Sequence, residues 1–456
     1  MMNTQSSAGK ARVGIIGAGV AGLAAAYDLT RQGYPVVIYE GLPVVGGLAA
    51  GFKAPHWDWP LERYYHHLFQ SDDEILNLAQ EVGAEFFFRR PITAMWHKGR
   101  GYAFDSPLRV LLFPHLSLPQ KIRMGLVIAY LRYLSRNWRR FERVTADAWL
   151  SRWMGRAAYE ALWQPLLIGK FGDHYRDVNL AWFWARIYKR SPALGYFVGG
   201  FQAFADRLAD RVRAQGGDIR LATPVESIRL RPEGSGLTVR TPSGEETFAA
   251  VIATVSPALM AKVAPDLPDA YLNRLRRLRS MGAVVMTLAL DRPLTKGLYW
   301  INLPKKEGFP FLALVEHTNY IEPERYGGDH LVYLGDYLDP GHPYFQMSQA
   351  ELLETFLPAL PRFNPEFQRS WVKGVWLHRT TYAQPVPPVN YSTYIPALET
   401  PVPGLYFASM SQVYPWDRGT NYAVEIGRRA GRLVSAYLKK ATQDREPVAL
   451  SAVPAP

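Results

Sequence analysis

The chain has 456 residues, of which 48% are hydrophobic, 13% aromatic and 20% charged, and its formal net charge is +12. A composition this apolar excludes a disordered chain, and the length predicts about three domain-sized units. The lack of cysteine excludes disulfides, cysteine-based zinc and iron–sulfur sites, a catalytic thiol and a cofactor attached through sulfur.

Neither end of the chain predicts secretion, and no segment predicts membrane insertion. Residues 1–12 lack the apolar core of a secretory signal, and no stretch reaches the roughly 18 apolar residues of a membrane span. Residues 441–456 are rich in Ala and Pro, which predicts a flexible tail. The arginines are scattered rather than gathered into a basic tail. We therefore expect a cytoplasmic protein without a nucleic-acid partner; the sequence leaves its oligomeric state open.

The first elements are a strand, a glycine-rich turn, a helix and a second strand. Residues 13–16 are a short apolar run typical of a buried parallel strand, residues 23–31 predict a helix, and residues 35–39 predict the second strand. The turn and the end of the second strand carry Gly17, Gly19, Gly22 and Glu40. A G-x-G-x-x-G pattern between strand and helix is the fingerprint of a dinucleotide-binding fold.

Each residue of this fingerprint has a physical role. Gly17 permits the tight turn, Gly19 lets the backbone approach a pyrophosphate, and Gly22 allows the helix to lie close to the sheet. Glu40 would accept hydrogen bonds from an adenosine ribose and repel a 2′-phosphate. The N–H groups at the start of the helix would hold the phosphates.

A second glycine pair indicates a cofactor longer than a nicotinamide dinucleotide. The chain continues after Glu40 to Gly46, Gly47, Leu48 and Ala49. A loop that passes beneath the pyrophosphate and ribityl region of a flavin needs such a pair, because its backbone N–H groups must meet the cofactor.

Later segments add to the pattern. Residues 196–201 precede an amphipathic helix, and residues 219–228, with Val225 inside, are strand-like. Residues 405–408 predict a late strand, and a final helix is expected from about residue 422 to 440. The turn between these last two elements contains Asp417, Gly419, Thr420 and Asn421.

These segments, in this order, resemble the FAD-dependent amine oxidase, protoporphyrinogen oxidase and phytoene desaturase superfamily. The resemblance implies FAD held without a covalent bond, a backbone contact to adenine near Val225, and a last helix whose N-terminus points at the flavin. A helix N-terminus would stabilise the negative charge of a reduced flavin. Thr420 or Asn421 could cap that helix, and Gly419 would clear space for the ring.

The chain departs from the superfamily at one position. Members usually place an aspartate after the strand that corresponds to residues 405–408, where it holds the ribityl chain, but here Ser409 follows. Either Asp417 replaces that aspartate or the contact is missing.

A narrower resemblance involves residues 63–69, Arg-Tyr-Tyr-His-His-Leu-Phe. This run is similar to the histidine-bearing loop beside the flavin in UDP-galactopyranose mutase. It implies an alternative function, a flavin-dependent isomerase of a sugar nucleotide.

The motif order predicts a discontinuous fold of the α/β class. We expect a Rossmann-like FAD-binding domain, a mixed-sheet substrate domain and a helical insertion. Their expected limits are 12–70, 195–260 and 400–440 for the first, 71–104 and 261–399 for the second, and 105–194 for the third.

Residues 121–143 of the insertion predict a basic amphipathic helix. The apolar stripe consists of Ile122, Leu126, Tyr130, Leu134, Trp138 and Phe141. We favour packing of this stripe against its own domain, with peripheral contact to an anionic membrane as the alternative.

Five side chains are candidates for the substrate site: His66, His67, Lys170, Arg379 and Tyr382. For the two histidines, one expectation is that they face the flavin or bind substrate, and the alternative is that they are buried structural groups. Lys170 is expected either to act near the flavin or to form a salt bridge. Arg379 and Tyr382, which follow a predicted strand at residues 376–378, line the pocket or pack in a loop. The histidines lack a third ligand at suitable spacing, so we expect no metal site.

The sequence thus predicts an FAD-dependent oxidoreductase that takes a hydride from a C–N or C–C bond of a small organic substrate. The alternatives are the sugar-nucleotide isomerase and a membrane-docked protein that holds flavin without turnover.

Overall fold

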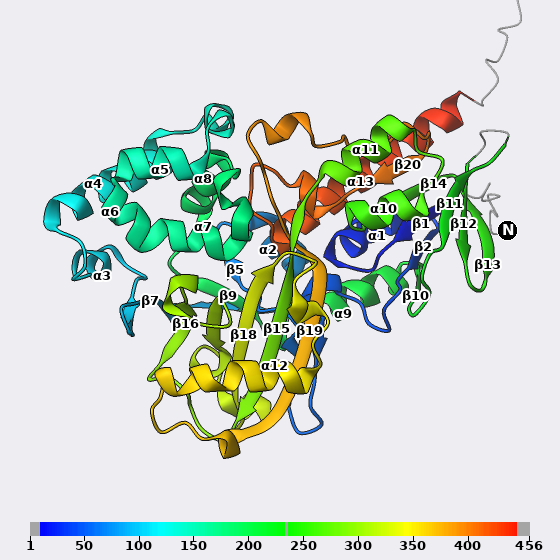
Figure 1. Ribbon diagram of the computed structural model, residues 1–456. Helices are drawn as coiled ribbons and strands as arrows, with labels where there is room; N and C mark the ends of the chain where they lie inside the picture. The colour runs from blue at the N-terminus through cyan, green and yellow to red at the C-terminus, as the bar shows by residue number, and fades with distance from the viewer. Residues whose placement is uncertain (1–9, 233–235, 445–456) are drawn as a thin grey trace, which may run out of the picture.

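The computed structural model describes residues 10–232 and 236–444. A five-stranded parallel sheet, ordered β10-β2-β1-β14-β20, occupies one side of the molecule (Figure 1). Its strands are β1 (Val13–Ile16), β2 (Val36–Tyr39), β10 (Asp218–Arg220), β14 (Ala250–Ala253) and β20 (Leu405–Phe407). The three central strands are short apolar runs and every residue in them is buried, as expected for a parallel sheet covered on both faces.

Alternate residues of these strands face opposite sides of the sheet. Ile15, Ile38 and Ile252 pack toward one face, which is covered by helices α1 (Val20–Arg31) and α13 (Thr420–Gln443). Helices α2 (Asp73–Val82) and α9 (Gly200–Ala214) join them on that face. Helices α10 (Pro257–Val263) and α11 (Asp269–Arg277) cover the other face.

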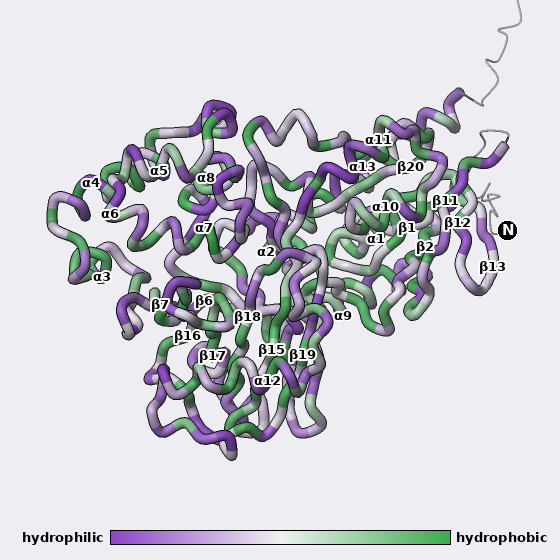
Figure 2. The backbone as a smooth tube through the Cα atoms, in the orientation of Figure 1, coloured by the Kyte–Doolittle hydropathy of each residue, from purple (hydrophilic) through white to green (hydrophobic). Residues whose placement is uncertain are grey.

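A seven-stranded mixed sheet forms the second large layer, ordered β19-β15-β18-β17-β16-β7-β8. The strands are β7 (Ile92–His97), β8 (Arg100–Ala103), β15 (Ser280–Leu290), β16 (Leu298–Asn302), β17 (Ala313–Glu316), β18 (His330–Leu338) and β19 (Val372–Pro385). Only the pairing of β16 with β7 is parallel among those described. Helix α12 (Gln349–Phe356) covers the outer face, and the hydrophobic colouring concentrates in the central strands (Figure 2).

Smaller sheets connect and extend these layers. They are β3 (Gly51–Phe52) with β4 (Leu61–Glu62), and β9 (Leu194–Phe197) between β5 (Leu68–Phe69) and β6 (Phe86–Arg89). The meander β11 (Ser227–Leu230), β12 (Leu237–Thr241) and β13 (Gly244–Phe248) flanks the parallel sheet.

A helical part lies at the end of the molecule opposite the parallel sheet (Figure 1). It contains α3 (Pro107–Leu111), α4 (Leu118–Ala129), α5 (Ala146–Met154), α6 (Arg156–Ala158), α7 (Gln164–Phe171) and α8 (Leu180–Lys189). The predicted fold class, a discontinuous Rossmann-like domain with a mixed-sheet domain and a helical insertion, is confirmed. In the described ranges, no helix is both long and apolar enough to cross a bilayer.

The predicted helix over residues 121–143 is wrong in two respects. Helix α4 ends at Ala129 and is followed by a π-helical turn at Tyr130–Leu134 and a 3₁₀ segment at Trp138–Arg143. The buried face is formed by Met124 and Leu131, whereas the predicted stripe residues Ile122, Leu126 and Leu134 are 51%, 68% and 77% exposed. Of the stripe, Phe141 is buried, and Tyr130 and Trp138 are half-buried against the same hydrophobic core.

Three further predictions need correction. Residues 219–228 do not form one strand, because β10 ends at Arg220 and Val225 lies in the loop before β11. Helix α13 extends to Gln443, so the first residues of the predicted flexible tail are helical, and residues 445–456 lie outside the described residues. Arg379 and Tyr382 lie within β19 rather than after it.

Candidate active site

A cavity of about 680 Å³ lies at the carboxyl ends of the parallel strands. Gly17, Glu40, Thr254 and Ala408 each directly follow one of four strands of the parallel sheet, and all four line the cavity. Ligands of open α/β sheets bind at this edge. The lining also includes residues from three distant parts of the chain, so the cavity exists only after the chain has folded.

The glycine-rich turn is held by close backbone contacts. Gly17 has a φ of +103°, and a Cβ there would lie 2.7 Å from the Thr254 hydroxyl. A Cβ on Gly22 would lie 2.0 Å from the carbonyl oxygen of Gly17, so the helix reaches the turn only because that position has no side chain. Helix α1 begins at Val20, with Gly19 as an N-cap residue that offers no side-chain cap, and both residues line the cavity. Its free N–H groups form an anion-binding end.

Glu40 ties the turn to the second strand. Its carboxylate accepts hydrogen bonds from the N–H groups of Ala18 at 2.7 Å and Leu42 at 2.9 Å, and the residue is 9% exposed. Each carboxylate oxygen has a second lone pair, which leaves capacity for a ribose hydroxyl.

The second glycine pair packs directly on the first motif. Gly46 and Gly47 have φ values of +108° and +59°, and the Gly46 N–H donates to the carbonyl of Ala18 at 2.9 Å. A Cβ on Gly47 would lie 3.0 Å from Cα of Gly19. Both glycines, with Leu48 and Ala49, line the cavity, and Val225 lines it near Ser256 and Leu259.

The start of helix α13 closes the far end of the cavity, but without the predicted cap. Gly419 is the N-cap residue, no side chain caps the helix, and Gly419 and Thr420 line the cavity. The side chain of Asn421 instead accepts a hydrogen bond from the N–H of Ile75 at 3.1 Å. The predicted cap by Thr420 or Asn421 is therefore wrong.

Asp417 does not replace the expected ribityl aspartate. It lies outside the lining of the cavity, and its carboxylate accepts hydrogen bonds from Arg186 at 2.5 Å and from the Trp182 indole at 2.9 Å. Ser409 lines the cavity in its place, and its hydroxyl lies 3.1 Å from that of Tyr382.

Three of the five candidate substrate-site residues line the cavity: His66, Arg379 and Tyr382. His66 donates from Nδ1 to the carbonyl of Tyr64, and burial lowers its pKa to about 4, so the ring is neutral at pH 7 with Nε2 free. Tyr382 bonds the hydroxyl of Ser411 at 2.8 Å. A neutral imidazole and a fixed phenol can orient a substrate or a flavin edge.

His67 and Lys170 lie outside the large cavity. Burial and the neighbouring Arg190 lower the pKa of His67 to about 3, and its Nδ1 is buried without a hydrogen-bond partner. Lys170 forms no salt bridge within the described residues, so that alternative is wrong. It lines a separate small void instead.

Sequence reasoning missed several residues of the cavity, above all Arg63, His378 and Arg418. Nε of Arg63, Nε2 of His378 and Nε of Arg379 are buried without a partner. Buried polar atoms rarely stay unpaired, so three such atoms around one cavity indicate that a polar ligand satisfies them. Arg63 stood in the run at residues 63–69, but nothing in the sequence placed His378 beside it.

The fold and the cavity together define a dinucleotide-dependent enzyme with an attached substrate domain. This chain belongs to the family described as flavin containing amine oxidoreductases, whose pattern matches residues 20–435. FAD is the cofactor that this family implies. The cavity fits it, because the glycine-rich turn, the pair Gly46–Gly47 and Glu40 line one part of the cavity and the unpaired nitrogens of Arg63, His378 and Arg379 lie around it.

Similar proteins include several chemistries. The chain is 28% identical to a carotenoid phi-ring synthase of Streptomyces griseus over 62% of this chain and 60% of that protein. It is similar in fold to a putative protoporphyrinogen oxidase of Exiguobacterium sp. (TM-score 0.73, 17% identity, 96% of this chain and 100% of the other). A reduced UDP-galactopyranose mutase has the same TM-score, at 15% identity over 95% and 98% of the two chains. The chain spans about 60% of the length of that curated relative.

Proposed function

We propose that this protein is an FAD-dependent oxidoreductase that removes a hydride from a C–N or C–C bond of an organic substrate. The observation that carries this proposal is the single cavity of about 680 Å³ that runs from the glycine-rich turn to His66, Arg379 and Tyr382. A bound flavin would supply the two-electron oxidising chemistry of this reaction.

The residues of the chain would bind and orient rather than transfer protons. The N-terminus of α1 and the glycine pairs would hold the pyrophosphate, and Glu40 the ribose. The uncapped start of α13 directs its N–H groups and positive dipole end toward the opposite end of the cavity, where they would stabilise developing negative charge. The substrate would lose a hydride from carbon to the flavin and a proton from the neighbouring atom to solvent, which leaves an imine or an alkene.

Purified protein tests the proposal directly. We expect flavin absorbance, and anaerobic bleaching when the right member of a panel of amines, porphyrinogens and polyenes is added. Gly19→Leu should lose nearly all of the bound flavin, because the leucine side chain would fill the end of the cavity that holds the pyrophosphate. The variant should still fold, because a Cβ at position 19 would make only an ordinary contact, 3.7 Å from Cα of Gly47. Gly125→Leu is the control, since Gly125 is exposed and has open space around it. Full flavin content in Gly19→Leu would contradict the placement of the cofactor.

The isomerase remains the second candidate, because Arg63, Tyr64 and His66 of the histidine-bearing run line the cavity. It requires reduced flavin and consumes no oxidant. Turnover of a sugar nucleotide only after dithionite reduction would support it over hydride removal. His66→Ala is a more direct test of the isomerase than His67→Ala, because His66 lines the cavity and His67 does not.

We further propose that the helical part docks on an anionic lipid surface. Ten of the 15 large hydrophobic residues that are exposed in the described structure lie between residues 108 and 153. These ten form what we call the apolar tip: Leu108, Leu111, Leu112, Leu118, Ile122, Leu126, Tyr133, Leu134, Val144 and Trp153. Patches of this kind on a soluble protein mark interaction sites.

The charges around the apolar tip favour lipid over protein as the partner. Exposed arginines of the same region are Arg123, Arg136, Arg139, Arg140, Arg143 and Arg152. Glu142, which lies between two of them, is buried and accepts a hydrogen bond from the Ser392 hydroxyl. Hydrophobic and hydrophilic residues alternate along α3 and α4 (Figure 2). Apolar side chains would enter the acyl region while the guanidinium groups meet lipid phosphates.

A further inference from the structure

Three hydroxyl groups from the two large sheets meet at the cofactor cavity. Tyr382 lies on β19 of the mixed sheet, whereas Ser409 and Ser411 follow β20 of the parallel sheet. The Tyr382 hydroxyl oxygen lies 3.1 Å from Oγ of Ser409 and 2.8 Å from Oγ of Ser411. It also accepts a hydrogen bond from the backbone N–H of Ser411 at 2.9 Å. We call these three residues the hydroxyl cluster.

Only part of the hydroxyl cluster faces the cavity. Tyr382 and Ser409 line it, whereas Ser411 does not line it and is 1% exposed. Burial raises the pKa of Tyr382, so the phenol keeps its proton at neutral pH and can donate a hydrogen bond.

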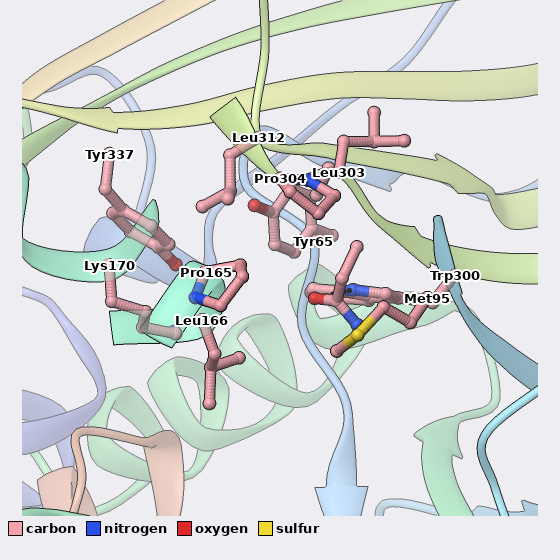
Figure 3. A pocket seen from close by; sticks show the side chains of 12 residues that line it. Tyr65, Met95, Pro165, Leu166, Lys170, Trp300, Leu303, Pro304, Leu312 and Tyr337 are labelled. Atoms are coloured by element: carbon pink, nitrogen blue, oxygen red, sulfur yellow. Dashed lines mark hydrogen bonds between the residues drawn. The ribbon is translucent and has the colours of Figure 1, made fainter. Parts of the chain in front are cut away.

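A second phenol of the mixed sheet does not take part. The ring of Tyr337 lies beside Lys170 (Figure 3), at a void of about 20 Å³ that shares no lining residue with the cofactor cavity. The Tyr337 hydroxyl accepts a hydrogen bond from Arg418. Tyr382 is therefore the phenol of this sheet that reaches the end of β20.

The capacity of the Tyr382 oxygen limits the directions of these hydrogen bonds. A hydroxyl oxygen has two lone pairs, and one of them already accepts the N–H of Ser411. Tyr382 can therefore accept from one serine hydroxyl at most, and it must donate its own hydrogen to the other.

Burial decides between the two serines. If Tyr382 donated to Ser411 and accepted from Ser409, the hydrogen of the Ser411 hydroxyl would have no acceptor within the described residues. A buried donor without an acceptor is unfavourable. The favoured chain therefore runs from Ser411 to Tyr382 to Ser409, and it leaves the Ser409 hydrogen free at the cavity.

The order of the strands shows which part of a bound cofactor lies at Ser409. Glu40, Gly17, Thr254 and Ala408 follow the adjacent strands β2, β1, β14 and β20 in that spatial order. Adjacent strands lie roughly 4.8 Å apart, so Ala408 lies about 10 Å from Gly17, on the side away from Glu40. With the ribose at Glu40 and the pyrophosphate at the glycine-rich turn, Ser409 lies toward the flavin half of FAD.

We propose that Ser409 donates a hydrogen bond to an acceptor on the flavin half of FAD, and that Tyr382 positions the Ser409 hydroxyl for this bond. The inference rests on the proposed function, because it takes FAD as the occupant of the cavity. It reverses the polarity that the superfamily has at this place, where an ionised aspartate can only accept. Glu40, at the other end, is the one acid in the described lining of the cavity.

The rate at which the purified holoenzyme releases FAD tests the proposal, followed by flavin fluorescence after dilution. Ser409→Ala should release FAD about tenfold faster than wild type, which is the factor expected for one hydrogen bond. Tyr382→Phe should release it several-fold faster. The double variant should be no faster than Ser409→Ala, because Tyr382 acts through Ser409. Ser435→Ala should leave the rate unchanged, since it removes a buried hydroxyl of α13 that bonds Gln32 outside the cavity.

ADP distinguishes a local contact from a general disturbance of the fold. It contains the adenosine and the pyrophosphate of FAD but lacks the flavin half. Calorimetric titration of the deflavinated full-length protein should therefore give the same affinity for ADP in wild type and in Ser409→Ala.

Wild-type release of FAD from Ser409→Ala, or equal weakening of FAD and ADP by this variant, would overturn the assignment. Additive effects in the double variant would overturn the role of Tyr382. If Ser409→Ala does not fold, Tyr382→Phe decides alone, because it keeps the ring and removes only the hydroxyl. A yellow protein whose FAD release ignores both residues refutes the hydroxyl contact alone, whereas a colourless wild-type protein refutes the flavin enzyme as a whole.

Discussion

Glu62, at the end of β4, is a buried carboxylate that is 1% exposed and has no cationic partner among residues 10–232 and 236–444. It accepts hydrogen bonds from the hydroxyl of Tyr196 at 2.8 Å and from the N–H of Phe201 at 2.8 Å. Burial outweighs these bonds and raises its pKa to about 7. The residue connects the loop at residues 63–69 to the start of α9, so its ionisation affects one wall of the cofactor cavity.

The raised pKa of Glu62 gives a pH dependence of stability with a definite sign. The folded state keeps the proton between pH 4.5 and about 7, whereas the unfolded state releases it, so stability falls as pH rises through this window. The shift corresponds to about 3 kcal/mol as an upper bound. Glu62→Gln should therefore gain stability relative to wild type between pH 5 and pH 8, measured by urea unfolding. Parallel pH profiles for the two proteins would contradict the assignment.

Helices α1 and α13 approach each other closely at two glycines of α13. A Cβ on Gly427 would lie 2.1 Å from the carbonyl oxygen of Ala21, whereas a Cβ on Gly431, one turn later, would lie 3.4 Å from that of Ala25. The backbone of α1 cannot move away easily, because its other side packs on the parallel sheet. This contact fixes the position of the α13 N-terminus at the cavity.

Alanine at the two glycines should have opposite consequences. Gly427→Ala should lower the free energy of unfolding by about 1–3 kcal/mol through overpacking and weaken flavin retention. Gly431→Ala is the matched control, since contact at its position is ordinary and alanine favours the helix by about 1 kcal/mol over glycine. Chemical unfolding and the flavin content of both variants check this. Equal stability of the two would mean that the helices separate freely.

The cofactor cavity and the proposed lipid-binding surface lie in different parts of the molecule. The cavity lies at the parallel sheet, and the residues of the apolar tip belong to the helical part at the opposite end (Figure 1). Docking through the apolar tip would therefore leave the cofactor cavity free.

Vesicle flotation tests the lipid surface at this scale. We expect the wild-type protein to float with vesicles that contain phosphatidylserine. Flotation should be weaker with pure phosphatidylcholine or at high salt, because the exposed arginines around the apolar tip would bind anionic lipid headgroups. Leu126→Gln with Leu134→Gln should reduce flotation several-fold. Val198→Gln with Leu230→Gln removes exposed apolar residues outside the tip and should have no effect. Flotation that is independent of Leu126 and Leu134 would rule out this surface.

Residues whose roles are local could be predicted from the sequence. The glycines at 17, 19 and 22 and Glu40 act through backbone conformation and contacts within one strand–turn–helix unit, and all except Gly22 line the cavity. His378 and Arg63 could not be paired with them, because His378 lies on β19 of the seven-stranded sheet and only the packing of the two sheets brings it to the cavity. The stripe from Ile122 to Phe141 was misassigned because periodicity alone does not show which face of α4 packs on the domain, and because a π-helical turn at Tyr130–Leu134 then changes the phase of the later residues.

The sequence alone predicted the cofactor, through the resemblance of its spaced motifs to a flavoenzyme superfamily. It also predicted the α/β fold class and the positions of the glycine-rich turn and of the pair Gly46–Gly47, because these depend on short-range steric and hydrogen-bonding rules. Only the tertiary structure decided which face of α4 is buried, that Asp417 pairs with Arg186 across 231 residues of the chain, and that His378 lies at the cofactor cavity. These features depend on packing between separate elements, and no local rule fixes the distance between such groups.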